Sequence, residues 1–172
     1  MKICNHWTAG TYNPCSTDLN AYHFLIDSAG RIYKGKYSPE DNLNCKDNKY
    51  AKHCGGGNTN CIGISLCGMF DFDLRTKETK YPITKKQFET LCALNAFLSQ
   101  NYNILINEKN VFTHYEFDKK QKIQKGKIDI TYLPFLPKLN SEFVGEYIRN
   151  KTKWYKQKKL KFIKKGKWYE II

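Results

Sequence analysis

The sequence has no long hydrophobic run and no leader-like start. Its longest apolar stretches, such as the one around Phe24 to Ile26, fall far short of the roughly 20 residues that cross a bilayer. The first residues also lack the basic, apolar and small-residue segments that together form a secretory signal. We therefore expect a chain that is synthesised in the cytoplasm and has no membrane anchor.

Paired-cysteine motifs are also missing. The seven cysteines are an odd number, and no two of them form a Cys-x-x-Cys motif. This pattern argues against a complete disulfide framework and against a zinc ribbon. We expect mainly free thiols, and burial is the usual state of such side chains.

Acidic residues are too few to balance the basic ones. Lys and Arg number 29 against 16 Asp and Glu, which gives a formal net charge of +13. Such a charge attracts polyanions, namely nucleic acid, an anionic membrane surface or acidic cell-wall polymers. The excess lies mainly in the tail, because residues 151–172 contain nine lysines and one glutamate.

Hydrophobic residues are numerous enough for a packed core. Of the 172 residues, 41% are hydrophobic and 15% are aromatic, which predicts one compact domain with a small appendage. A capping box from Thr84 to Gln87 and the helical spacing after it predict a helix over residues 84–102. Strands are expected over residues 2–6, 22–26, 31–33, 62–66 and 110–114, and a short helix over 141–149 precedes a hairpin over 160–163 and 168–172.

The four histidines, His6, His23, His53 and His114, lie at expected strand ends or in glycine-rich turns. A catalytic zinc ion takes three protein ligands and leaves a fourth position to water, and two histidines with one carboxylate form a usual set. His6, His114 and Asp129 could supply that set. The alternative for each histidine is a structural role in which the ring is buried and hydrogen-bonded. We favour that role for His23, because His23 and its neighbour Tyr22 point to opposite faces of the expected strand.

Lys127 and Asp129 are two residues apart. In an extended segment their side chains point to the same face. A lysine ammonium would then stand beside a metal-bound carboxylate and could stabilise an oxyanion. The alternative interpretation is an ion pair in solvent.

Several segments occur together in one order along residues 2–137. They are Ile3-Cys4-Asn5-His6-Trp7-Thr8-Ala9-Gly10, Tyr22-His23-Phe24-Leu25-Ile26-Asp27, His53-Cys54-Gly55-Gly56, Asn60-Cys61-Ile62-Gly63-Ile64, Val111-Phe112-Thr113-His114-Tyr115-Glu116 and Gly126-Lys127-Ile128-Asp129. In this order they resemble the zinc N-acetylmuramoyl-L-alanine amidases, the family that includes amidase-type phage lysozymes and peptidoglycan recognition proteins.

The resemblance implies a fold and a set of roles. The fold is an α/β fold with a mixed central sheet flanked by helices, here with a catalytic domain over residues 1–137 and a basic appendage over 138–172. One zinc ion would be held by His6, His114 and Asp129. Tyr22 and Lys127 would be the catalytic residues, and the substrate-binding residues would be Trp7, His53 and Asn60.

The implied reaction cuts the amide bond between N-acetylmuramic acid and L-alanine in peptidoglycan. Without a leader, the chain would be a monomeric phage or prophage endolysin that reaches the cell wall after release from the host cytoplasm. Two departures from the family stand out. Ser65 replaces a glutamate found in some branches and cannot act as a general base at neutral pH, and the short stretch before Tyr22 predicts a turn in place of a helix.

Other functions remain open at this point. The chain could be a non-catalytic peptidoglycan recognition module or a cytosolic wall-recycling amidase, while nucleic-acid binding rests on charge alone and is disfavoured. In the tail, lysines interleave with Trp154, Tyr155, Phe162, Trp168 and Tyr169. This pattern suits binding to an anionic cell-surface polymer or membrane, but it also suits a hairpin whose aromatic side chains cover the catalytic domain.

Overall fold

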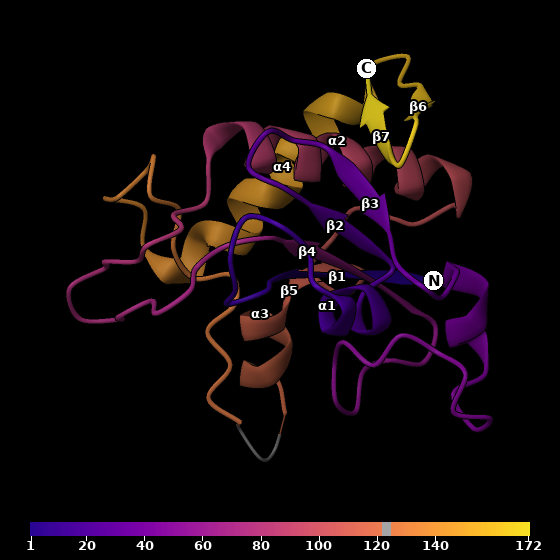
Figure 1. Cartoon of the computed structure of the whole chain (residues 1–172), viewed down its shortest axis with the longest axis horizontal. Helices are drawn as coiled ribbons and strands as arrows, with labels where there is room; N and C mark the ends of the chain where they lie inside the picture. The colour runs from indigo at the N-terminus through magenta and orange to yellow at the C-terminus, as the bar shows by residue number, and fades with distance from the viewer. Residues whose placement is uncertain (122–124) are drawn as a thin grey trace.

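The computed structural model describes residues 1–121 and 125–172 (Figure 1). The helices are α1 (Ser16–Ala21), α2 (Lys85–Asn101), α3 (His114–Lys119) and α4 (Val144–Lys156), with 3-10 turns at Pro39–Leu43 and Ser141–Phe143. The strands are β1 (Lys2–Trp7), β2 (Phe24–Ile26), β3 (Ile32–Lys34), β4 (Cys61–Leu66), β5 (Val111–Thr113), β6 (Phe162–Lys165) and β7 (Trp168–Ile171).

All seven strands form one sheet in the order β5-β1-β4-β2-β3-β7-β6. The four strands β5, β1, β4 and β2 run parallel, and the remaining pairs are antiparallel. This confirms the predicted mixed central sheet. Because the carboxyl ends of parallel strands meet at one edge, residues at the ends of β1 and β5 lie side by side.

The two faces of the sheet carry different side chains. Along β1, Ile3 and Trp7 belong to the large hydrophobic core, whereas Cys4 belongs to a separate small cluster with Cys54 and Cys61. Successive side chains of a strand point to opposite faces, so His6 lies on the same face as Cys4. In Figure 1, α2 and α4 lie on one side of the strands and α1 and α3 on the other.

Helix α2 begins where the capping box predicts. Thr84 Oγ1 accepts a hydrogen bond from the Gln87 amide at 3.1 Å, and Gln87 Oε1 accepts one from the Thr84 amide at 2.9 Å. The Gln87 side-chain amide also donates to the carbonyls of Ile26 and Cys67. One polar side chain therefore fixes the helix start to the ends of β2 and β4.

Three segments differ from the sequence prediction. The strand expected over residues 110–114 ends at Thr113, and His114 begins helix α3, because the Thr113 side chain caps that helix. The predicted turn before Tyr22 contains a six-residue helix, α1, because the Asp18 carboxylate accepts from the Cys15 amide and caps its first turn. The predicted short helix over 141–149 is a 3-10 turn followed by the longer α4. Helix α4 continues because Val144, Ile148 and Thr152, spaced four apart, form a buried stripe within a lysine-rich sequence.

The chain after residue 137 adds to the same sheet. Strand β7 pairs with β3 through Ile32 and Tyr169, and β6 closes the predicted hairpin. The Phe162 ring stacks on Tyr169 at 4.7 Å between centroids and also meets Phe24 and Phe97. The aromatic residues of the tail thus pack against the domain.

The cysteines and the lengths of the helices are two further features of the fold. All seven cysteines lie in the described ranges and all are free thiols. No helix within the described residues is long and apolar enough to cross a membrane.

Candidate metal centre

Two histidines meet at the carboxyl edge of the parallel strands. His6 is the penultimate residue of β1, and His114 directly follows β5 as the first residue of α3. The two strands are adjacent, with Asn5 opposite Thr113, so the next residue of each segment, His6 and His114, lies close to the other. The two imidazole centroids are 4.7 Å apart.

Asp129 completes the group. Its Oδ2 atom lies 2.8 Å from His6 Nδ1 and 3.2 Å from His114 Nδ1. All three side chains are buried, and one ligand atom from each lies within 4.8 Å of the others. The Asp129 carbonyl accepts a hydrogen bond from the Tyr115 amide at 2.7 Å, which holds the aspartate segment against α3. The structure therefore brings together the three candidate ligands expected from the sequence.

Within the trio of His6, His114 and Asp129, the aspartate carboxylate and the histidine rings stabilise each other's charged forms. Burial raises the pKa of Asp129, but hydrogen bonds from His114 and His6 outweigh burial and bring the pKa down to about 2. Burial likewise opposes charge on His114, yet hydrogen bonds to Asp129 and Cys54 raise the pKa of His114 to about 9. The site is thus built to hold a carboxylate next to positive charge.

The donor set fits a zinc ion. Two imidazole nitrogens and one carboxylate oxygen form a recurrent catalytic zinc set, and here they converge from three separate segments. A cavity of about 430 Å³ opens onto His114 and Asp129, which leaves room for solvent or substrate in a fourth position. The residues that would hold the ion are His6, His114 and Asp129.

Tyr22 lies next to the trio. Its ring centroid is 5.2 Å from that of His6, and its side chain lines the same cavity. Burial, followed by the Asp129 charge, raises the pKa of Tyr22 well above its usual value. The phenol therefore keeps its proton at neutral pH and can donate a hydrogen bond into the cavity.

Lys127 lines the cavity from the opposite segment and is exposed to solvent. Its backbone amide donates to Asp118 Oδ2 at 3.1 Å, and the Lys125 amide donates to the same carboxylate. Burial opposes charge on Asp118, but these amides outweigh it and lower the Asp118 pKa. Asp118 thus fixes the backbone that carries Lys127 toward the cavity.

The three substrate-binding candidates lie in different places. Trp7 and His53 both line the cavity, and the Trp7 ring packs edge-on against Phe72 at 5.3 Å. His53 is only 6% exposed, and both of its ring nitrogens have protein partners. Asn60 directly precedes β4, at the far end of that strand from the centre, and is not among the residues that line this cavity.

The contacts of Cys54 were not expected from the sequence. A hydrogen bond from the Cys4 thiol lowers the pKa of Cys54 to about 5 against the effect of burial, and the His114 ring contributes to the lowering. Cys4, His6 and His53 also form a second close group of potential ligand atoms. In the sequence, Cys54 directly follows His53, and this position could have indicated these contacts. The expectation that free thiols are simply buried gave Cys54 no further part.

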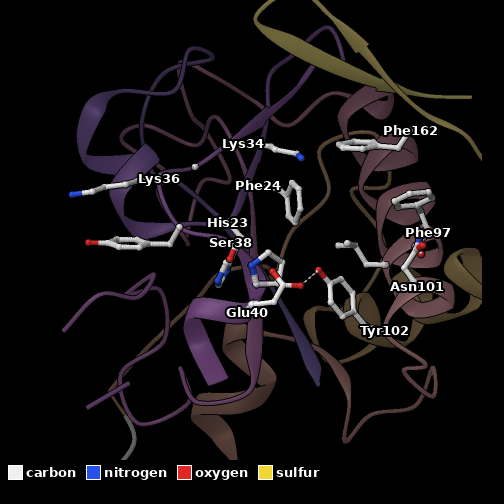
Figure 2. Close-up of a pocket in the computed structure, with 14 residues that line it drawn as sticks. His23, Phe24, Lys34, Lys36, Ser38, Glu40, Phe97, Asn101, Tyr102 and Phe162 are labelled. Carbon is white, nitrogen blue, oxygen red and sulfur yellow. Dashed lines mark hydrogen bonds between the residues drawn. The ribbon is translucent and has the colours of Figure 1, made fainter. Parts of the chain in front are cut away.

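A second cavity of about 590 Å³ lies between β3 and the end of α2 (Figure 2). His23, Lys34 and Lys36 border it, and a hydrogen bond from Tyr102 to Glu40 at 2.7 Å closes one side. Both ring nitrogens of His23 are hydrogen-bonded to protein groups. This cavity is larger than the one at the trio, but it lacks a comparable set of converging ligands among its lining residues.

Comparisons with known proteins were made for the sequence and for the fold. The family model described as N-acetylmuramoyl-L-alanine amidase matches residues 2–129. A comparison with curated protein sequences finds no significant match.

Three solved structures resemble the fold. N-acetylmuramoyl-L-alanine amidase LysC from Clostridium intestinale URNW is 21% identical, with a TM-score of 0.53 over 88% of this chain and 83% of that one. The endolysin amidase LysCS from the same organism is also 21% identical, with a TM-score of 0.53 over 88% of this chain and 82% of that one. The amidase AmiD from E. coli, in a complex with an anhydro-muramoyl peptide, is 18% identical, with a TM-score of 0.49 over 70% of this chain and 50% of that one.

Proposed function

The chain belongs to the N-acetylmuramoyl-L-alanine amidase family, and from this premise we propose that it is a zinc-dependent endolysin with its centre at His6, His114 and Asp129. Members of this family are peptidoglycan amidases, which cleave the amide bond between N-acetylmuramic acid and L-alanine. The proposal adds the metal, the roles of individual residues and the biological setting.

The observation that carries the proposal is the convergence of the trio. Each of the three side chains comes from a different segment, yet their ligand atoms lie within 4.8 Å of one another. A recognition module without turnover has no need for a complete ligand set. Here the set is complete, and a protonated phenol and a lysine border the same cavity.

Each residue has a distinct task in the proposed reaction. A bound zinc ion supplies Lewis acidity that polarises the scissile carbonyl and lowers the pKa of water to about 7. The amide carbonyl gathers negative charge as the tetrahedral intermediate forms. The Tyr22 hydroxyl donates a hydrogen bond to that oxygen, and the Lys127 ammonium stabilises it electrostatically.

The same cavity suits a wall substrate. Trp7 contributes part of an apolar wall together with Phe72, and Lys127 provides a cation for the carboxylates of a stem peptide. We propose that the enzyme acts as a monomer on the cell wall. The lysines of the C-terminal tail are proposed to hold it on anionic wall polymers or on the membrane surface, as discussed below.

The test is digestion of purified peptidoglycan by the zinc-loaded protein. We expect new amino termini of alanine without new reducing sugars, loss of activity on chelation and recovery on addition of zinc. Binding to the wall without released amino termini would identify a recognition module. Activity that survives complete chelation would contradict the assigned role of zinc.

Variants separate the ligands from the catalytic groups. His114→Ala and Asp129→Ala should each lose bound zinc, measured as metal content after gel filtration. Tyr22→Phe should keep its zinc and lower kcat about 100-fold, because one oxyanion donor is removed. Equal loss of zinc from all three variants would contradict the separate roles.

A further inference from the structure

The outer nitrogen of His6 faces a second histidine. His6 Nδ1 points to Asp129, and His6 Nε2 lies 3.1 Å from Nδ1 of His53. The two rings are nearly perpendicular, with an interplanar angle of 77°. Both are buried, and His6 is 0% exposed, so water does not compete for this contact.

The partner of His53 fixes the direction of this hydrogen bond. His53 Nε2 lies 3.1 Å from the carbonyl oxygen of Cys61, and a carbonyl oxygen can only accept. His53 Nε2 therefore carries the proton, which leaves a lone pair on Nδ1 in the neutral ring. The donor in this contact is therefore His6 Nε2–H. His6 Nδ1 is the atom that faces Asp129, and with zinc bound it would contact the metal in place of its hydrogen bond to Asp129, while the ring proton stays on Nε2.

The fold reserves space for the His53 ring. A Cβ atom added to Gly63 of β4 would lie 2.4 Å from His53 Cγ, so only glycine lets the ring lie on the strand. The position of His53 is thus fixed by β4 on one side and by His6 on the other.

We infer that His53 is a positioning residue for the zinc ligand His6, and not a substrate-binding residue. It accepts a hydrogen bond from His6 Nε2–H and donates one to the Cys61 carbonyl, and so presents His6 Nδ1 to the metal. A partner of this kind on the outer nitrogen of a ligating histidine fixes its tautomer and raises its basicity. The inference rests on the proposed zinc centre.

The experiment measures zinc affinity in two variants of the full chain. His53→Leu removes both hydrogen bonds and keeps much of the side-chain volume, so zinc should bind about 10–100-fold more weakly. His53→Gln can accept from His6 and donate to Cys61, so its affinity should lie within a few-fold of the wild type. The dissociation constant is measured by competition with a chromophoric chelator.

His23→Gln is the matched control. His23 is an equally buried histidine with its ring 5.5 Å from that of His53, but it makes no hydrogen bond to the trio. This variant should leave zinc affinity unchanged, even if its thermal stability falls. A drop in affinity as large as that of His53→Leu would show a general loss of packing and overturn the inference.

Nitrogen-15 NMR gives a second readout that packing alone would not move. In the zinc-loaded protein, the proton of His6 should be found on Nε2 and that of His53 on Nε2. A metal-bound Nε2 in His6, or a proton on Nδ1 of His53, would overturn the inference. A wild type that binds no zinc would contradict the proposed function, whereas tight zinc binding by both His53 variants would contradict this inference alone.

Discussion

His23 illustrates how hydrogen-bond partners decide the role of a histidine. The Gly63 amide donates to His23 Nδ1 at 2.8 Å, so His23 Nε2 carries the ring proton and donates to Asn42 Oδ1 at 2.9 Å. Asn42 in turn bonds the backbone of Ala51 and Asn58. The neutral ring therefore connects β4 to the loop that carries His53, and this confirms the structural role expected for His23.

The first prediction concerns stability below neutral pH. Burial lowers the pKa of His23 to about 4 from 6.5, although Asp41 and Glu40 face it and favour its charged form; the neighbouring His53 ring packs against it. As pH falls from 6.5 toward 4, the unfolded chain takes up a proton that the folded chain excludes, so stability falls. The loss should reach about 3 kcal/mol in the free energy of unfolding, measured by urea denaturation.

His23→Gln provides the comparison for that prediction. The glutamine amide can accept from Gly63 and donate to Asn42, but it does not titrate. The difference in unfolding free energy between wild type and variant should therefore shrink as pH falls from 6.5 to 4. A difference that stays constant across this range would show that the His23 ring is not excluded from protonation.

Single residues differ in how far the sequence could place them. The meeting of His6 and His114 was predictable, because each lies at the end of an expected strand and parallel strands bring those ends together. Asp129 lies on no strand, so this argument does not extend to it. The partner of His6 was not predictable either, since His53 comes from a loop whose path depends on Asn42 and Gly63. Spacing along the chain carries no information about which nitrogen of a ring meets which acceptor.

Helices α3 and α4 are joined by a pair of opposite charges, Glu116 and Arg149. Glu116 of α3 accepts from the Thr113 amide at 2.9 Å and so caps the helix that begins with His114. Arg149 of α4 lies 2.9 Å from Glu116, and its guanidinium also donates to the Val111 carbonyl. A Cβ atom on Gly145 would overlap the Glu116 carboxylate, so α4 needs glycine there to approach α3.

The second prediction is that Arg149→Ala destabilises the fold strongly. The side chains of Arg149 and Glu116 are only 11% and 17% exposed, so the variant leaves a nearly buried carboxylate without its partner. Breaking such a pair typically costs about 3 kcal/mol or more. Thermal or urea unfolding of the zinc-free protein measures the change without a contribution from bound metal.

Lys119→Ala is the control for the charge itself. Lys119 of α3 pairs with Glu142 in the 3-10 turn before α4. Both side chains are 47% exposed, and exposed pairs contribute about 1 kcal/mol or less. Equal effects of the two substitutions would contradict the importance of burial. The resemblance to the family ends before α4, which is why the sequence analysis treated this helix as part of an appendage and missed its contact with α3.

The C-terminal hairpin has an apolar side that packs against the sheet and a positively charged side that faces solvent. The aromatic residues of β6 and β7 are half-buried against the sheet, whereas the lysines around them are exposed. The hairpin was predictable from its alternating pattern. Its attachment to β3 was not, because the strand register there consists of one residue pair, Ile32 with Tyr169. The two interpretations of the tail, aromatic packing on the domain and binding to an anionic surface, are therefore compatible. The aromatic residues pack on one side and the lysines form a cationic surface on the other.

The last prediction tests the cationic surface. Four exposed lysines of the tail, Lys159, Lys161, Lys164 and Lys167, are replaced by glutamine, which removes charge and leaves the packed aromatic residues in place. Retention on cell walls that carry anionic polymers should weaken at least about tenfold at low ionic strength, since a lysine near an anionic surface contributes on the order of 1 kcal/mol. Because salt screens exposed charges, the wild type should lose the same advantage as ionic strength rises. Turnover of a soluble muramoyl peptide and the unfolding midpoint should stay unchanged, and unaltered wall retention at low salt would contradict a binding role for the tail.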